Sequence, residues 1–330
     1  MQMEFNNYHE INDFRLKGIA LSSQSNEDLN EFHDLIYHHV LSMSVNQIKL
    51  RYGQAPSPFT FFVMGSAGRM EQSIWSDQDH GVIYQMKNEE SKEYFIRLGE
   101  EISKGLMLAG YTKCPGGVMA SNPMWSKSAD DWRLQINHWA CDSSWEAIRY
   151  LLIFADARPF HGDPLLLSNL KKELFTIIDK KHLIIKLLHN TMHLKKGVGI
   201  LGQLLVETHG TFSGSINLKN TAFFPYVNAV RLLALSEWIP ETSTLARIQL
   251  IPENIISFED KASYSRNFSN LLNFRLKHGI HSDYASGHYV NGAQLTKLEK
   301  KELKDILKAG ERLFIKARKL IEKGVKYGNE

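Results

Sequence analysis

Apolar residues in the first third of the chain recur first at helical spacing and then in continuous runs. From about residue 26 to residue 50 they are spaced three or four apart, at Leu29, Phe32, Ile36, Val40 and Met43. This spacing predicts an amphipathic helix, which ends at the break Ala55-Pro-Ser-Pro58. The run Phe59–Met64 is apolar and aromatic-rich and predicts a buried strand, and residues 81–84 predict another. Residues 91–106 return to helical spacing.

The pattern changes near residue 165, beyond which nearly every segment has helical spacing. The last predicted helix begins with Thr296 and Glu299, spaced as a capping box. The sequence therefore predicts an α+β domain, with a small mixed sheet and flanking helices, followed by an all-α helical bundle. We assign residues 1–27 to an N-terminal extension, 28–165 to the α+β domain and 166–330 to the helical domain.

Composition excludes several classes of protein. The net charge of +3 is too small to predict nucleic-acid binding. The sequence contains no run of about eighteen apolar residues, so it predicts no membrane span. The chain has two cysteines and a polar start without an export signal, so we expect a cytoplasmic protein.

The segment Met64–Tyr84 contains the residues that indicate chemistry. An apolar strand leads into Gly65-Ser66, and Gly68 allows a second tight bend. Glycines let the backbone approach a ligand closely, so that N–H groups can point at phosphate oxygens. The Ser66 hydroxyl can donate another hydrogen bond, and the Arg69 guanidinium can pair with a phosphate. These residues predict a phosphate-binding turn.

Two carboxylates follow the turn. Asp77 and Asp79 stand two residues apart at the start of the second predicted strand, where side chains i and i+2 share a face. Like charges this close are most easily kept ionised by a cation, and hard carboxylate oxygens suit Mg²⁺, with Mn²⁺ as an alternative. Either motif alone is common in surface loops. The two together predict a metal–nucleoside triphosphate site.

At this point the chain resembles the polymerase-β-like nucleotidyltransferases, in particular the N-terminal domain of protein-PII uridylyltransferases. It is most similar to a family of nucleotidyltransferases in bacterial signal-transduction proteins, with a helical substrate-binding domain at the C-terminus. The shared motifs lie across most of the chain: Gly65-Ser-Ala-Gly-Arg-Met-Glu71, Ser76-Asp-Gln-Asp79, Cys114-Pro-Gly-Gly-Val-Met-Ala120, Asn122-Pro-Met-Trp125, Ile153-Phe-Ala-Asp-Ala-Arg158, Gly162-Asp163, Ile216-Asn-Leu-Lys219 and Ala229-Val-Arg-Leu-Leu-Ala-Leu235.

The resemblance implies that Gly65 and Ser66 contact the triphosphate and that Asp77 and Asp79 bind the metal. It also implies transfer of a nucleoside monophosphate from NTP to a hydroxyl, on a regulatory protein or on a small molecule. The alternative function is a nucleotide-binding regulatory or interaction module with weak or no turnover.

A third carboxylate, typical of the superfamily, is not obvious from the sequence. Asp156 is our candidate for this catalytic role, because it lies in a distinct segment with Arg158. The alternatives are that Asp156 makes a structural contact with Arg158, or that Glu71 or Asp163 takes the role. Arg69 likewise has two interpretations, a phosphate ligand or a partner of Glu71.

Other residues have a structural and a functional interpretation, and the structural one is favoured for each. Cys114 is expected to be a small buried residue. His189 and His193, four apart, are expected to be a surface or packing pair, not a metal pair. The tryptophans at 125, 132, 139 and 145 are expected to form a core stripe on consecutive helical turns. Charged and polar groups of the helical domain that could contact substrate are Asn217, Lys219 and Arg231.

Overall fold

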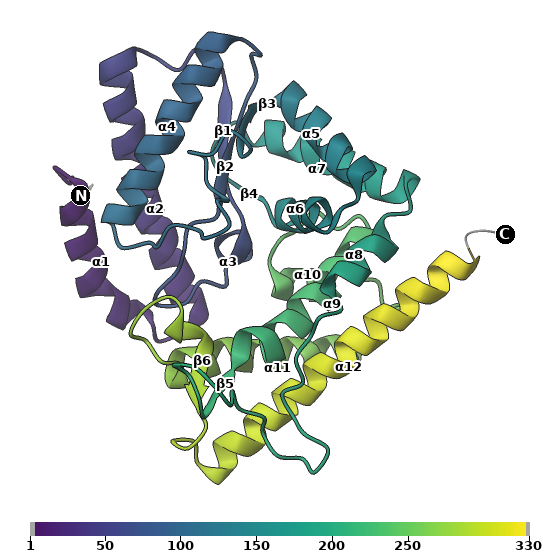
Figure 1. Ribbon diagram of the computed structural model, residues 1–330. Coiled ribbons are helices and arrows are strands. Elements are labelled where there is room, and N and C mark those ends of the chain that lie inside the picture. The colour runs from purple at the N-terminus through teal and green to yellow at the C-terminus, as the bar shows by residue number, and fades with distance from the viewer. Residues whose placement is uncertain (1–3, 328–330) are drawn as a thin grey trace. The chain divides into compact units, whose positions relative to one another are not determined.

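The computed structural model describes residues 4–327, with side chains to residue 324, and forms two compact units (Figure 1). The first unit comprises the residues up to His138 together with Asp156–Leu174. The second comprises Trp139–Ala155 and the residues from Phe175 onward. A mixed sheet lies in the first unit and most of the second is helical, so the predicted α+β class with a following helical domain is confirmed.

The first unit is built on a four-stranded sheet in the order β3-β2-β1-β4. Strand β1 (Phe59–Val63) pairs antiparallel with β2 (His80–Tyr84) and with β4 (Arg158–Gly162). Strand β3 (Ser126–Ser128) lies parallel to β2. The central strands are buried on both faces, which explains why the sequence reads as a continuous apolar run here and not as an alternation.

Three long helices pack together in the first unit: α1 (Tyr8–Ser22), α2 (Asn26–Tyr52) and α4 (Glu89–Leu108). The predicted helix over residues 26–50 is α2. Its first turn is capped by the Ser25 side chain, which accepts a hydrogen bond from the Asp28 N–H. Of its predicted stripe, Leu29, Phe32, Ile36 and Val40 are buried and Met43 is partly exposed. A single helical turn, α3 (Gly65–Gly68), follows β1.

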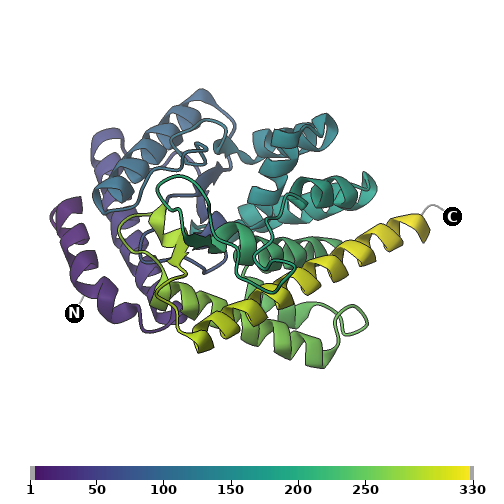
Figure 2. The same cartoon turned by 60° about the horizontal axis from the view of Figure 1, so that its bottom comes forward.

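The second unit is a group of helices around α9 (Phe224–Ser236). The others are α6 (Trp145–Ala155), α8 (Ile184–Thr191), α10 (Thr244–Leu250), α11 (Phe258–His278) and α12 (Lys297–Tyr327). Helix α12 runs along α9 and α11 (Figure 1 and Figure 2). The capping box at its start is confirmed, because Thr296 and Glu299 exchange backbone and side-chain hydrogen bonds. Helices α5 (Ala129–Asp142) and α7 (Pro164–Lys180) carry the chain between the two units.

The second unit is not purely helical. Strands β5 (Ser215–Asn217) and β6 (Tyr289–Asn291) form a two-stranded antiparallel sheet, and η2 (Ser286–His288) precedes β6. Between β5 and α9 lies a π-helical turn, η1 (Lys219–Phe223). Strands of three residues are too short for an alternating pattern to predict.

The predicted stripe of four tryptophans is wrong. Trp125 precedes β3 and lies outside any helix, whereas Trp132 and Trp139 lie on α5. Trp145 begins α6 and is 49% exposed. Trp125 and Trp132 do pack together, with ring centroids 5.9 Å apart. Regular spacing in sequence thus misled because Trp125 comes before α5 begins and Trp145 begins a separate helix. Across the described residues, no helix has the length and apolar character that a membrane crossing needs.

Candidate active site

The antiparallel register of β1 and β2 brings the glycine turn and the two aspartates to one edge of the sheet. Phe59 is level with Tyr84, and Val63 with His80. The next pair continues the ladder, since the Met64 N–H donates to the Asp79 carbonyl at 2.8 Å. Residues that follow β1 therefore lie beside residues that precede β2. This is why two motifs separated by ten residues can form one site.

Helix α3 is a single turn that begins on Gly65, whose φ is +55°. Its first i to i−4 hydrogen bond is donated by the Gly68 N–H to the Met64 carbonyl at 2.8 Å. The N–H groups of Gly65, Ser66 and Ala67 precede that bond and have no acceptor within the turn. Such groups at the start of a helical turn can donate to an anion.

The second bend of the turn is not at Gly68, as the sequence predicted, but at Met70. Met70 has a φ of 59°, and the Glu71 N–H donates to the Ser66 carbonyl at 2.8 Å. This is the left-handed helix end that glycine usually occupies. Gly68 serves another purpose: a Cβ on it would overlap the backbone carbonyl oxygen of Asp156. Its small size lets the turn pack against the segment that leads into β4.

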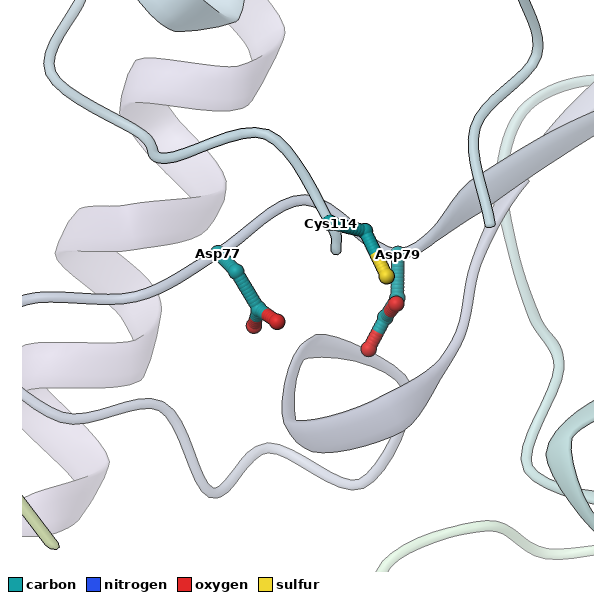
Figure 3. A group of neighbouring side chains, drawn as sticks. All are labelled: Asp77, Asp79 and Cys114. Carbon is teal, nitrogen blue, oxygen red and sulfur yellow. The ribbon is translucent and has the colours of Figure 1, made fainter. Parts of the chain in front are cut away.

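Asp77 and Asp79 point to the same side of the segment that carries them, as their spacing predicts (Figure 3). One ligand oxygen from each carboxylate and the Cys114 sulfur all lie within 4.8 Å of one another. Asp77 is buried and Asp79 partly exposed. Among the residues that the structure describes, Asp77, Asp79 and Cys114 form the one group of three acidic, histidine or cysteine side chains that lie close enough together to share a cation.

The residues between and after the aspartates hold this segment from the interior. The Gln78 amide donates to the carbonyls of Ser103 and Tyr111, at 3.2 and 3.1 Å. Its oxygen lies 3.1 Å from His80 Nε2, while His80 Nδ1 accepts from the Ala120 N–H at 3.1 Å. His80 Nε2 therefore carries the proton. Burial lowers the pKa of His80 to about 3, so that the ring is neutral and acts as a fixed support.

Cys114 reaches the aspartates through a short pairing between distant segments. Asp77 forms a parallel bridge with Thr112, in which the Gln78 N–H donates to the Thr112 carbonyl at 3.0 Å. Burial and the charge of Asp79 raise the pKa of Cys114 to about 12, and the thiol donates a hydrogen bond to Asp79. Sequence reasoning missed this neighbour because neither a CxxC spacing nor any local pattern connects position 114 with position 79.

Arg69 and Asp156, both proposed from the sequence, contact each other. Arg69 Nη1 lies 2.8 Å from Asp156 Oδ2, and Arg69 Nε lies 2.7 Å from Glu71 Oε2. Asp156 is 1% exposed and is not in the group around Asp77. Burial disfavours the charged guanidinium, but Glu71 and Asp156 together raise the pKa of Arg69. The ion pairs tie the end of α3 to the segment before β4.

The alternative contact, Asp156 with Arg158, is not formed. Arg158 instead makes a two-pronged ion pair with Asp34 on α2, at 2.9 and 2.8 Å. It also donates to the Ala67 carbonyl at 3.1 Å. Two arginines therefore brace α3, one at its end and one within the turn. Neither partner of Arg158 could be inferred from local spacing.

The donor set suits a hard divalent cation. Two carboxylates are the side-chain ligands that Mg²⁺ and Mn²⁺ take alongside phosphate oxygens and water. The thiol is a softer donor than these cations prefer, and with its raised pKa it stays protonated beside Asp79. The residues present therefore fit Mg²⁺ on Asp77 and Asp79.

The remaining candidates lie in the second unit. His193 packs edge-on against the Trp145 ring, with centroids 5.2 Å apart, as expected for a packing residue. Arg231 is buried, and its Nη1 donates to the Asn228 side chain at 3.0 Å. Asn217 donates to Glu207 and to the Tyr289 hydroxyl, at 3.3 and 3.2 Å.

Two family models match the chain. The first, described as "Putative nucleotidyltransferase DUF294", matches residues 15–146. The second, described as "Putative nucleotidyltransferase substrate binding domain", matches residues 181–319. The first match includes Gly65, Ser66, both aspartates and Cys114, whereas Asp156 falls outside both. No curated protein matches the chain.

Proposed function

Because the chain belongs to the family of nucleotidyltransferases that these two models define, we propose that it moves a nucleoside monophosphate from NTP to a hydroxyl acceptor. One observation carries the proposal: Asp77 and Asp79 converge beside a helical turn whose leading N–H groups have no acceptor within it. That pairing of carboxylates with a phosphate-binding turn fits a metal-bound triphosphate.

In this proposal Asp77 and Asp79 hold Mg²⁺, or Mn²⁺ in its place. The metal, when bound, neutralises charge on the phosphate oxygens during in-line displacement. The N–H groups of Gly65 and Ser66, with the Ser66 hydroxyl, orient the triphosphate by donating hydrogen bonds. Arg69 is committed to Glu71 and Asp156, so we assign these side chains to positioning the turn and not to contact with phosphate.

The acceptor is proposed by resemblance. Uridylyltransferases of protein PII modify a hydroxyl on a regulatory protein, and a similar acceptor would place this chain in signal transduction. Small-molecule acceptors are the other class that the superfamily offers. The second unit, which matches a family model for substrate binding, is the part of the chain that we expect to hold the acceptor.

A second candidate function is nucleotide binding without turnover, as a regulatory or interaction module. The observation in its favour concerns the third acid. Among the described residues, the side chain that joins Asp77 and Asp79 is a cysteine and not a carboxylate. A site without a base that activates the acceptor hydroxyl would bind Mg²⁺–NTP and transfer slowly.

Labelled-nucleotide transfer tests the proposal. The purified protein is incubated with each of the four labelled NTPs, Mg²⁺ and a cell extract, and transfer and pyrophosphate release are measured. We expect Asp77→Asn and Asp79→Asn to lower the rate at least about a hundredfold, because each removes a metal ligand. Asp13→Asn, which changes an exposed acid of the same unit, is the matched control. Binding of Mg²⁺–NTP without any transfer supports the module, and absence of binding contradicts both functions.

A further inference from the structure

The short sheet of the second unit brings the start of the π-helical turn beside the loop before β6. Strand β5 pairs with β6 so that Ser215 is level with Asn291 and Asn217 with Tyr289. Lys219 follows β5 by two residues, and His288 directly precedes β6. Lys219 is also the first residue of η1. Single π-helical turns are uncommon and occur frequently at functional sites.

Lys219 is a partly buried cation whose contacts are aromatic. Its Nζ donates to the Tyr284 hydroxyl at 3.4 Å and lies 5.6 Å from the centroid of the Tyr284 ring. No carboxylate of the described residues forms an ion pair with it, although nearby Lys195 is paired with Glu207 at 3.0 Å. Removing an ammonium from water without a counter-charge is unfavourable, and one hydroxyl does not offset the loss.

His288 extends the same cluster. Its ring lies edge-on to Tyr284, with centroids 5.0 Å apart, and its Nε2 is buried with no hydrogen-bond partner among the described residues. Burial, together with the charges of Lys219 and Arg275, lowers the pKa of His288 to about 3. Both charges that act on this ring are positive. The local potential therefore favours an anion.

We propose that Lys219, Tyr284 and His288 form a binding site for a phosphate-class anion, either inorganic phosphate or the phosphate group of a monoester. The Lys219 ammonium has three donors, of which Tyr284 takes one. An anion would accept the others, would give His288 Nε2 a partner and would balance the positive charge of Lys219. The site lies within the second unit, and its existence does not depend on nucleotidyl transfer.

Calorimetry on the full chain tests binding directly. The titrants are inorganic phosphate and the monoester glucose 6-phosphate, with acetate as an anion of another shape. We expect Lys219→Met to weaken binding by about ten- to a hundredfold, the usual effect of removing a charged donor, and Lys219→Arg to restore most of it. Lys319→Met removes an exposed lysine of the same unit and should leave binding unchanged. Binding of the monoester alone would identify the esterified source.

Thermal unfolding gives a second measurement. The sign of the change in Tm caused by Lys219→Met distinguishes an anion-binding lysine from one that only stabilises the fold. Without phosphate, Lys219→Met should raise Tm, because it removes an uncompensated cation. With phosphate, Tm should rise for the wild type and not for the variant. Tyr284→Phe keeps the ring and loses the hydroxyl, so it should weaken binding severalfold in a folded protein. Absence of saturable phosphate or monoester binding in the wild type, or equal binding by Lys219→Met, overturns the proposal.

Discussion

The carboxylate of Asp79 lies against the Cα of Gly65, in the space that a side chain at position 65 would occupy. A Cβ built on Gly65 would overlap Asp79 Oδ2, and the φ of Gly65 is itself in the left-handed region. Glycine is therefore required here for close approach as well as for its conformation. The position of the Asp79 carboxylate therefore depends on the shape of the turn at Gly65.

Substitution of Gly65 by alanine should consequently affect ligand binding more than stability. We expect Gly65→Ala to displace the Asp79 carboxylate and to weaken Mg²⁺–NTP binding by at least about tenfold, since a shift of this size misplaces a metal ligand. The strained φ should cost about 1–2 kcal/mol in the free energy of unfolding. Calorimetry and urea denaturation measure the two effects separately.

The matched control is Gly202→Ala. Gly202 has a φ of +76°, and nothing lies within 4 Å of a Cβ built on it. This variant should lose a similar amount of stability and keep its affinity for Mg²⁺–NTP. If Gly65→Ala bound nucleotide as tightly as Gly202→Ala, the close contact with Asp79 would have no functional role.

The buried pair of Arg69 and Asp156 should be important mainly for stability. Asp156→Ala leaves the buried Arg69 guanidinium with one fewer carboxylate partner, since its pair with Glu71 remains, so it should lower the free energy of unfolding by about 2–3 kcal/mol. Arg69→Met takes the guanidinium away from two buried carboxylates, Glu71 and Asp156, and should cost at least as much. As a control, Asp130→Ala breaks an exposed pair with Arg133 and should change stability by less than about 1 kcal/mol.

Transfer rates for the same pair distinguish a positioning role from a catalytic one. If Asp156 acts by holding Arg69, then Arg69→Met and Asp156→Asn should lower kcat to a similar extent. If Asp156 were the general base, Asp156→Asn alone would lose about 10²–10⁴-fold and Arg69→Met far less. Measurement of kcat for both variants decides between the roles.

The predictable parts of the site are those set by local geometry. The two-residue period of extended chain places Asp77 and Asp79 on one side, and a short connection between antiparallel strands places Ser66 near them. The partners of the arginines are not of this kind. Asp34 lies 124 residues from Arg158, and only the packing of α2 against the sheet edge brings them together. Spacing along the sequence contains no signal for such a contact.

Glycine positions show a second limit of sequence reasoning. A glycine can serve a left-handed bend or a close packing contact, and the residue type alone does not say which. In this turn Gly68 serves packing against Asp156, whereas Met70 takes the left-handed conformation. The bend was therefore predicted two residues too early, although the presence of a tight turn was predicted correctly.

Cys114 should make the site sensitive to thiophilic cations. Its sulfur lies within 4.8 Å of a ligand oxygen of each aspartate, and sulfur ligands favour Cd²⁺ and Zn²⁺ over Mg²⁺. Cd²⁺ should therefore bind the wild type and inhibit it, with ultraviolet absorbance from sulfur-to-cadmium charge transfer. Cys114→Ser should weaken Cd²⁺ binding about tenfold and abolish the absorbance. Mg²⁺-dependent binding of NTP should be retained.

Cys141 provides the control for this experiment. It is exposed and lies in the second unit, so Cys141→Ser should leave the Cd²⁺ affinity and the absorbance unchanged. Equal Cd²⁺ binding by the wild type and Cys114→Ser would mean that the sulfur does not reach a cation held by the aspartates.

The capping box of α12 should add a defined pH dependence to stability. Hydrogen bonds from the Thr296 backbone and hydroxyl, with help from Lys277, lower the pKa of Glu299 from 4.5 to about 2. A carboxyl whose pKa is lower in the folded state stabilises the fold fully above its unfolded pKa, and the contribution disappears as pH falls through the folded value.

The stability difference between the wild type and Glu299→Gln should therefore be constant above about pH 5 and should shrink between pH 4.5 and pH 2. Thermal unfolding of both proteins from neutral pH downward measures it, and Glu302→Gln, on an exposed position of the same helix, should give no such trend. A difference that stayed constant down to the lowest pH at which the protein folds would show that the charge of Glu299 does not stabilise the cap. The cap would then be stabilised by the hydrogen bond that the Glu299 N–H donates to the Thr296 hydroxyl.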